Sequence, residues 1–197
     1  MVDDGSTYRS RDVLRRWQRS GRLRDMTVIE KPATGIVDTL NLALERARGE
    51  IVVRLDGDAT IETPGWLEKM TGLLLTDERV GVVTGRIVFD NGRVHSYGIN
   101  LVGPEGVHDR GTRISEPAGC RTSDQNVTRA LDGAWPEGDT LAEVDSAGGC
   151  CMAFRRDLAA RIGGFDTAYS PVWVEDFDFA LGRAGKARRS STSRTCA

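Results

Sequence analysis

The run Ile51-Val52-Val53-Arg54-Leu55-Asp56-Gly57-Asp58 decides the fold of this chain. It begins as a continuous apolar stretch, rich in β-branched residues and bounded by Gly49 and Gly57, which is typical of an interior strand of a parallel sheet. Two carboxylates, Asp56 and Asp58, follow at the carboxyl end of that strand, where α/β proteins bind ligands. Two acidic groups at one point repel each other, and a divalent cation with anionic oxygens offsets that repulsion. The run therefore predicts metal-assisted handling of a phosphate ester.

Two other interpretations compete for the acidic turn. An Asp-x-Asp tripeptide often arises by chance in a chain with 28% charged residues, and most such tripeptides are surface turns. A calcium-binding loop is the second alternative, because alternate residues from Asp56 to Glu62 carry oxygen-bearing side chains. That loop requires Gly at its sixth position and Glu at its twelfth, where this chain has Ile61 and Leu67. The strand before the turn favours the phosphate interpretation.

Composition limits the choice of architecture and partner. A chain of 197 residues with 39% hydrophobic content and alternating strand-like and helix-like segments predicts one α/β domain. The net charge of −2 and the pI near 5.8 give no reason to expect nucleic acid as a partner. Basic residues do crowd segments 9–24 and 186–194. Such runs are usually solvated faces, and the alternative is a patch for a membrane surface or an anionic acceptor.

The cysteines indicate a reducing compartment. Cys120, Cys150, Cys151 and Cys196 form no Cys-x-x-Cys pair, and neither histidine has metal-ligand spacing to any of them. No stretch of 18 apolar residues is long enough to span a membrane. The opening residues Met1-Val2-Asp3-Asp4 are unlike a signal peptide. We therefore expect reduced thiols and a cytoplasmic protein.

Periodicity and turn residues predict the order of the elements. Helices are expected after a Ser6 or Thr7 cap up to Gly21, over 35–48 after a Thr34 cap, from Pro64 to Leu75, and over 157–162. Strands are expected over 26–29, 51–55, 80–88 and 150–154, with a hairpin at Asp90-Asn91-Gly92. Residues 103–141 lack any pattern, and a loop of that length is usually functional or mobile.

A second acidic cluster, Trp173-Val174-Glu175-Asp176-Phe177-Asp178-Phe179, predicts the start of a helix. Carboxylates in a first helical turn are favoured by the helix dipole, so a well-capped helix is one explanation. The flanking Gly148-Gly149 pair and Trp173 favour another, because small and aromatic residues let a sugar ring stack. The cluster is therefore a candidate binding or catalytic site.

Several short segments follow one another along the chain in a characteristic order. They are Val2-Asp3-Asp4-Gly5-Ser6, Leu40-Asn41-Leu42-Ala43-Leu44, residues 47–58, Gly163-Gly164-Phe165-Asp166 and Glu175-Asp176-Phe177-Asp178-Phe179. Together they resemble the signatures of family 2 glycosyltransferases with the GT-A fold. The resemblance implies an α/β fold in which a Rossmann-like mixed sheet is flanked by helices. It also implies transfer of a sugar from a nucleotide-diphosphate sugar to an acceptor hydroxyl with inversion, as in polysaccharide or cell-envelope glycan synthesis.

The resemblance assigns roles residue by residue. Asp4, with Asp3 and Ser6 beside it, would recognise a uracil or thymine base, so the implied donor is a UDP or dTDP sugar. Asp56 would face the ribose, and Asp58, with Asp56, would ligate Mn²⁺ or Mg²⁺ on the diphosphate. Asp176 would be the general base and Glu175 its support. Gly148, Gly149 and Trp173 would border a glycan or lipid-linked acceptor.

The resemblance also divides the chain. It implies a single domain over residues 1–182, with a nucleotide-sugar-binding half at 1–100, an acceptor-binding half at 101–182 and a basic, disordered tail at 183–197. The family's usual first strand and helix are expected to be lacking, because Met1 directly precedes the Val-Asp-Asp-Gly-Ser turn, and the chain looks truncated at both ends. Two alternatives to the enzyme remain: an inactive fragment that binds nucleotide or a partner chain, and a calcium- or phosphate-binding module. The expected location is the cytoplasm, with peripheral association at the cytoplasmic membrane face.

Overall fold

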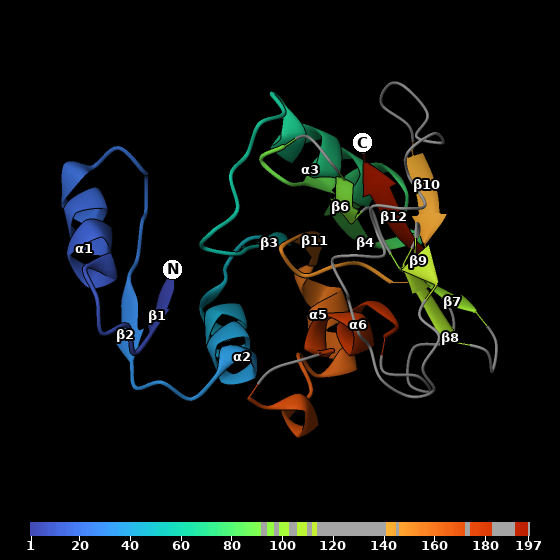
Figure 1. The fold of residues 1–197 in the computed structure, drawn as a ribbon. Helices are drawn as coiled ribbons and strands as arrows, with labels where there is room; N and C mark the ends of the chain where they lie inside the picture. Colours follow the sequence, from blue (N-terminus) through green and yellow to red (C-terminus); the bar gives the residue numbers. More distant parts are fainter. Residues whose placement is uncertain are drawn as a thin grey trace.

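A five-stranded mixed sheet organises the computed structural model, in the order β10-β12-β4-β11-β3 (Figure 1). Its strands are Leu141–Val144 (β10), Thr192–Cys196 (β12), Val80–Gly85 (β4), Cys151–Arg155 (β11) and Ile51–Leu55 (β3). β12 and β4 run parallel, and every other neighbouring pair in this sheet is antiparallel. The structure describes residues 1–91, 94–96, 99–102, 106–109, 112–113, 141–144, 146–171, 174–182 and 192–196.

The strand that carries the acidic turn lies at an edge of this sheet. Among the described strands β3 pairs with β11 alone, antiparallel, with Leu55 opposite Cys151. The prediction of an interior strand of a parallel sheet is therefore wrong, although its bounds are correct. An apolar run shows that a strand is buried, but it does not reveal the direction of the neighbouring strand. The edge position leaves Ile51, Val52 and Val53 only half-buried.

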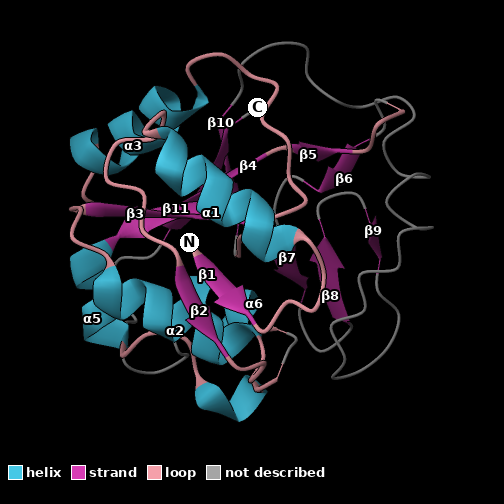
Figure 2. Cartoon of the chain, turned by 90° about the vertical axis from the view of Figure 1, so that its left-hand side faces the viewer, coloured by secondary structure: helices cyan, strands magenta, loops and turns pink. Residues whose placement is uncertain are grey.

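A smaller unit holds the first part of the chain (Figures 1 and 2). Val2–Asp4 (β1) and Ile29–Lys31 (β2) form a two-stranded parallel sheet, joined by the helix Ser10–Ser20 (α1). The strand predicted at 26–29 is displaced because Val2 pairs with Ile29, which sets the register. Gly21 ends α1 with φ at 65°, as predicted, but the helix starts after Arg9 without a side-chain cap, so the predicted cap is wrong.

Helices cover both faces of the five-stranded sheet. The helix Trp66–Thr76 (α3) packs Met70 and Leu74 on one face. The opposite face is covered by Ile36–Arg46 (α2), Arg156–Ile162 (α5) and Glu175–Ala180 (α6). α2 also contacts β1, so it joins the small unit to the main sheet. Successive residues of β11 alternate between the two faces, as a pleated strand requires, with Met152 and Phe154 facing α2, α5 and α6.

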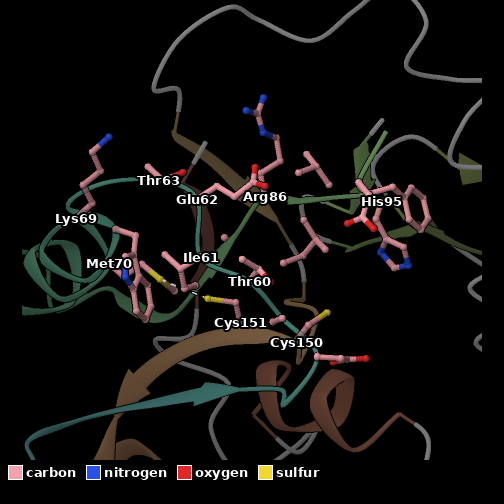
Figure 3. Close-up of a pocket in the computed structure, with 18 residues that line it drawn as sticks. Thr60, Ile61, Glu62, Thr63, Lys69, Met70, Arg86, His95, Cys150 and Cys151 are labelled. Carbon is pink, nitrogen blue, oxygen red and sulfur yellow. Dashed lines mark hydrogen bonds between the residues drawn. The ribbon is translucent and has the colours of Figure 1, made fainter. Parts of the chain in front are cut away.

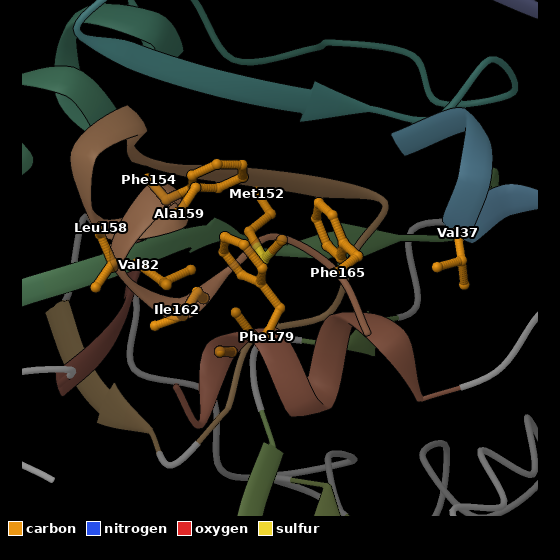
Figure 4. Close-up of a cluster of buried hydrophobic side chains, with 11 residues drawn as sticks. Val37, Val82, Met152, Phe154, Leu158, Ala159, Ile162, Phe165 and Phe179 are labelled. Atoms are coloured by element: carbon orange, nitrogen blue, oxygen red, sulfur yellow. The ribbon is translucent and has the colours of Figure 1, made fainter. Parts of the chain in front are cut away.

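An aromatic cluster anchors α6 in the core (Figure 4). The ring of Phe179 stacks on Phe165 at a centroid distance of 4.4 Å and lies 4.5 Å from the ring of Phe154. Asn41 of α2 holds the Phe165 backbone from both sides, donating to its carbonyl at 2.9 Å and accepting from its N–H at 2.9 Å. Gly164, at φ 74°, leaves room for this pair, because a Cβ there would lie 2.7 Å from the Asn41 oxygen. The Gly163 to Asp166 and Glu175 to Phe179 segments are therefore packed together.

Other predicted elements are refined by the structure. The strand expected over 80–88 is divided into β4 and Ile87–Val88 (β5), and β5 pairs antiparallel with Val94–Ser96 (β6) as the predicted hairpin requires. Ile99–Val102 (β7), Gly106–Asp109 (β8) and Thr112–Arg113 (β9) form a separate sheet. The expectation of an unpatterned segment from 103 is thus wrong for β8 and β9. Residues 114–140 lie outside the described part of the chain.

Part of the expected disordered tail is a strand. Thr192–Cys196 forms β12, between β10 and β4, so the expectation is wrong for these five residues. Backbone hydrogen bonding to the open edge of β4 does not require an apolar side-chain pattern, which explains why the sequence pattern failed here. Within the described residues, no helix combines the length and apolar character that crossing a membrane requires.

Candidate functional site

Antiparallel pairing brings two loops to one end of the sheet. β3 ends where β11 begins, so the Asp56 turn lies beside the Gly148-Gly149-Cys150 turn. The Asp56 N–H donates to the Cys150 carbonyl at 2.9 Å, and the Asp56 carbonyl accepts from Ala59 at 3.1 Å. The first contact fixes the acidic turn against the glycine turn, and the second closes it.

A side chain of β4 holds the Gly148-Gly149-Cys150 turn in place. The buried Thr84 hydroxyl donates to the carbonyls of Cys151 at 3.1 Å and Gly148 at 3.3 Å. On its other side, the Gly149 N–H donates to Oδ2 of Asp176 at 2.7 Å. The structure therefore brings together Gly149, Asp176 and the acidic turn, which the sequence had placed in three separate segments.

α6 presents two carboxylates to this end of the sheet. Glu175 is buried at 4% exposure, whereas Asp176 is only half-buried. Oδ1 of Asp176 accepts from the Phe177 N–H at 2.8 Å, so each of its oxygens has a backbone donor. Both acidic residues precede the Phe179 anchor by about one turn, which fixes their direction. Trp173, the third predicted acceptor residue, lies outside the described residues.

A buried arginine connects the acidic turn to α6. Arg54, at 8% exposure, donates from Nε to Oδ1 of Asp56 at 3.2 Å and from Nη1 to Oε1 of Glu175 at 3.1 Å. Arg54 was not predicted as a site residue from the sequence. Its signal was present, because a charge inside an apolar strand needs a buried counter-charge.

The predicted base-binding residues lie in the small unit. Asp4 accepts from the N–H groups of Thr34 at 2.9 Å and Gly35 at 3.0 Å, and from Lys31 Nζ. Burial raises the pKa of the Asp4 carboxyl, but these hydrogen bonds outweigh it and hold the pKa below its ordinary value. Asp4 thus binds the backbone N–H groups just before α2. The predicted Thr34 cap is wrong, because α2 begins after Gly35 and has no side-chain cap.

Asp3 and Ser6 form a second contact set in that unit. The Ser6 hydroxyl hydrogen-bonds to the Asp3 carboxylate and lowers its pKa against the opposing effect of burial, and Arg11 Nε donates to Oδ2 at 2.8 Å with the same effect. Among the described residues, no hydrogen bond joins Asp3, Asp4 or Ser6 to the Asp56 turn. The structure keeps these two groups as separate sets.

A cavity of about 440 Å³ opens beside Asp58 (Figure 3). It lies between the acidic turn, the start of α3, and the chain after β4. Its lining residues are Asp58, Ala59, Thr60, Ile61, Glu62, Thr63, Trp66, Lys69, Met70, Gly85, Arg86, Ile87, Val88, Phe89, Asp90, His95, Cys150 and Cys151. Burial, and then the negative charge of Asp56, raise the pKa of the Cys150 thiol. Cys150 therefore remains a neutral thiol, and Cys151 packs its sulfur 4.0 Å from that of Met70.

The acidic turn suits a divalent cation that arrives with its ligand. Asp58 is exposed and makes no hydrogen bond or ion pair with the residues that the structure describes, whereas Asp56 is tied to Arg54. Within the same described residues, no group of three or more His, Cys, Asp or Glu side chains is arranged to hold a metal ion by itself. Mg²⁺ in nucleotide sites is usually held by one or two carboxylates together with phosphate oxygens and waters. The free Asp58 carboxylate fits that donor set, with Asp56 as its neighbour.

The fold of the chain has counterparts among solved structures. The chain is similar to the solved structure of the mannosyltransferase PcManGT from Pyrobaculum calidifontis in complex with GDP-Man and Mn²⁺, with 26% identity and a TM-score of 0.58. The alignment covers 98% of this chain and 46% of that one, so this chain spans less than half the length of that protein. A second solved structure, A197 from STIV, aligns at 13% identity and a TM-score of 0.46, over 98% of this chain and 78% of that one.

Sequence comparison gives the family. No curated protein matches the chain. The sequence profile of Glycosyl transferase family 2, however, matches residues 1–127, well over half of its length. The mixed α/β sheet flanked by helices agrees with the GT-A fold of the mannosyltransferase. The chain belongs to glycosyl transferase family 2.

Proposed function

We propose that this chain transfers a sugar from a nucleotide-diphosphate sugar to an acceptor hydroxyl, with inversion at the anomeric carbon. One observation carries the proposal: the half-buried Asp176 carboxylate is held 2.7 Å from the Gly149 N–H, at the end of the sheet where Asp56 and Asp58 leave β3. A candidate base and a candidate phosphate site thus share one end of the fold. The family and the GDP-Man and Mn²⁺ complex of the similar mannosyltransferase support this choice of donor class.

The donor is proposed to span both units of the chain. Asp4, with Asp3 and Ser6, recognises the base, and Asp56 accepts from the ribose. Asp58, with Asp56, holds Mn²⁺ or Mg²⁺ on the diphosphate, where the cation stabilises the negative charge of the leaving group. The proposed base is uracil or thymine, and a guanine donor is the comparison case because the similar mannosyltransferase holds GDP-Man.

Asp176 is proposed to take the proton from the acceptor hydroxyl. The acceptor oxygen then forms its bond to the anomeric carbon while the bond from that carbon to the diphosphate oxygen breaks on the opposite face, and the nucleoside diphosphate leaves. Glu175 is buried and paired with Arg54, so it supports the site while the more accessible Asp176 acts as base.

The acceptor is proposed to approach along Gly148, Gly149 and Trp173, next to the cavity at Asp58. Trp66 and Phe89 in the cavity lining offer flat apolar surfaces of the kind on which sugar rings stack. The proposed acceptor is a glycan or a lipid-linked sugar of polysaccharide or envelope synthesis, at the cytoplasmic membrane face. The exposed arginines of α1 support that setting by offering positive charge to anionic lipid.

A donor panel tests the proposal. The folded chain is incubated with Mn²⁺ and UDP, dTDP and GDP sugars, and release of the nucleoside diphosphate is followed with and without EDTA. Metal-dependent release from at least one donor is expected, since water replaces the acceptor slowly in such sites. Binding without release would favour an inactive nucleotide-binding fragment, and the absence of both would overturn the proposal.

A further inference from the structure

One guanidinium touches three segments that lie far apart in the sequence. Arg54 reaches Asp56 at the end of β3 and Glu175 at the start of α6, at 3.2 and 3.1 Å. It also lies against the glycine turn, because a Cβ on Gly149 would be only 2.4 Å from its Nη1. Gly149 in turn donates to Asp176. Arg54 therefore contacts the acidic turn, the glycine turn and the helix that carries the proposed base.

The Arg54–Glu175 ion pair is buried, so its geometry is constrained by the surrounding protein. Arg54 and Glu175 are 8% and 4% exposed, so neither charge is satisfied by bulk water. Removing Arg54 would take a charged partner away from the enclosed Glu175 carboxylate, and losing a partner of a buried charge is strongly destabilising. The planar guanidinium can donate to both carboxylates at once in fixed directions, which a lysine ammonium on a flexible stem cannot do.

Asp56 and Glu175 share the Arg54 guanidinium as a hydrogen-bond donor. Asp56 is one-third exposed, so it is the partner that an incoming ligand can reach, whereas Glu175 is enclosed. A ribose hydroxyl or a divalent cation that binds Asp56 weakens its pairing with Arg54. The pairing of the guanidinium with Glu175, on the helix that carries Asp176, would then be strengthened.

We propose that Arg54 is a positioning residue that couples donor binding at Asp56 to the placement of the Asp176 carboxylate, through Glu175 and Gly149. The expected effect on kcat rests on the proposed function. Its structural content, the placement of Asp176 by Arg54, does not depend on which reaction the site performs.

Substitution of Arg54, followed by an attempt to restore activity with added guanidinium ion, tests the coupling. Arg54→Lys and Arg54→Ala are each expected to lower kcat by roughly 10- to 100-fold, the usual effect of losing a residue that orients a site, with a smaller change in donor KM. Added guanidinium ion should restore part of the turnover of Arg54→Ala and none of that of Asp176→Asn. Arg155→Ala is the matched control, since Arg155 lies on the adjacent strand and donates to the backbone carbonyls of Val80 at 2.8 Å and Asp77 at 3.1 Å. It should lower stability while kcat per folded molecule stays unchanged.

A second readout does not require turnover. Among the described residues, the N–H groups of Gly149 and Phe177 donate to Asp176, so the hydrogen exchange of these two amides reports the placement of its carboxylate. In Arg54→Lys both amides should exchange at least tenfold faster, while the amide of Ala153 within β11 keeps its protection. Unchanged exchange at both amides in Arg54→Lys would overturn the coupling. A normal kcat of Arg54→Ala in the absence of added guanidinium ion would also overturn it. A wild-type chain that is inert toward every donor, with exchange altered as expected, would instead overturn the proposed function alone.

Discussion

The Gly149 N–H donates to Oδ2 of Asp176 across 2.7 Å, and this bond joins the turn before β11 to the first turn of α6. A side chain at Gly149 would displace the Arg54 guanidinium, because a Cβ there would lie 2.4 Å from its Nη1. The contact fixes one oxygen of Asp176, and the Phe177 N–H fixes the other at 2.8 Å. A carboxylate held by backbone donors has a defined direction, which a general base needs.

Replacing Asp176 separates chemistry from binding. Asp176→Asn keeps the size of the side chain but removes the basic oxygen, so turnover should fall by roughly 10² to 10⁴ while donor affinity stays nearly intact. Steady-state rates and calorimetric donor binding on the same preparation check this. Asp157→Asn is the control, because Asp157 lies in the first turn of another helix, where it accepts from the Leu158 N–H at 2.8 Å and pairs with the exposed Arg161 at 2.5 Å. If Asp176→Asn lowers the melting temperature only as much as the loss of a helix cap does, and turnover stays normal, Asp176 is not the general base.

Asn41 should govern the stability of the α6 anchor. Asn41→Ala leaves the N–H and carbonyl of Phe165 without the partners they have at 2.9 Å, and should lower the free energy of unfolding by about 1–3 kcal/mol. Urea denaturation measures this change. Glu45→Ala, on the exposed side of the same helix, should stay within about 0.5 kcal/mol of wild type. Equal stability of the two variants would show that the Asn41 contacts contribute nothing.

The small unit should lose stability in acid. The native pKa values of Asp3 and Asp4 lie below the ordinary 3.8, so both carboxylates stabilise the fold above that pH. The free energy of unfolding should then fall as the pH drops below about 4, through the native pKa values. Asp4→Asn should be less stable than wild type at pH 6 and show a shallower decline below pH 4. Asp12→Asn, on the exposed face of α1, should follow the wild-type curve. Parallel curves for wild type and Asp4→Asn would contradict the lowered pKa of Asp4.

The local elements were predictable where sequence pattern and packing agree. The bounds of β3, the turn after it and the glycine end of α1 follow from apolar runs and from glycine at positive φ. The antiparallel pairing of β3 with β11 and the inclusion of β12 in the sheet did not follow. Both depend on backbone hydrogen bonds between segments far apart in the chain, and these leave no periodic trace in the side chains.

The site shows the same division. Asp58 and Asp176 were predicted as site residues because carboxylates after a strand and at a helix start are local features of the sequence, and their roles stay predictions. The long-range contacts around the site were not predicted, since Arg54 reaches Glu175 across 121 positions and Asn41 reaches Phe165 across 124. Asp4 was predicted as a base-binding residue, and that role stays a prediction beside its observed contacts to Lys31, Thr34 and Gly35.

Metal-dependent donor binding at Asp58 tests the central claim most directly. Titration calorimetry with a nucleotide-diphosphate sugar is run in Mn²⁺ and in EDTA for wild type, for Asp58→Asn, and for Glu62→Gln, which removes another exposed carboxylate from the same cavity. Hard cations depend on charged oxygen ligands, so binding should require Mn²⁺ in wild type and Glu62→Gln and be lost in Asp58→Asn. Equal, metal-independent affinity in all three proteins would contradict the account.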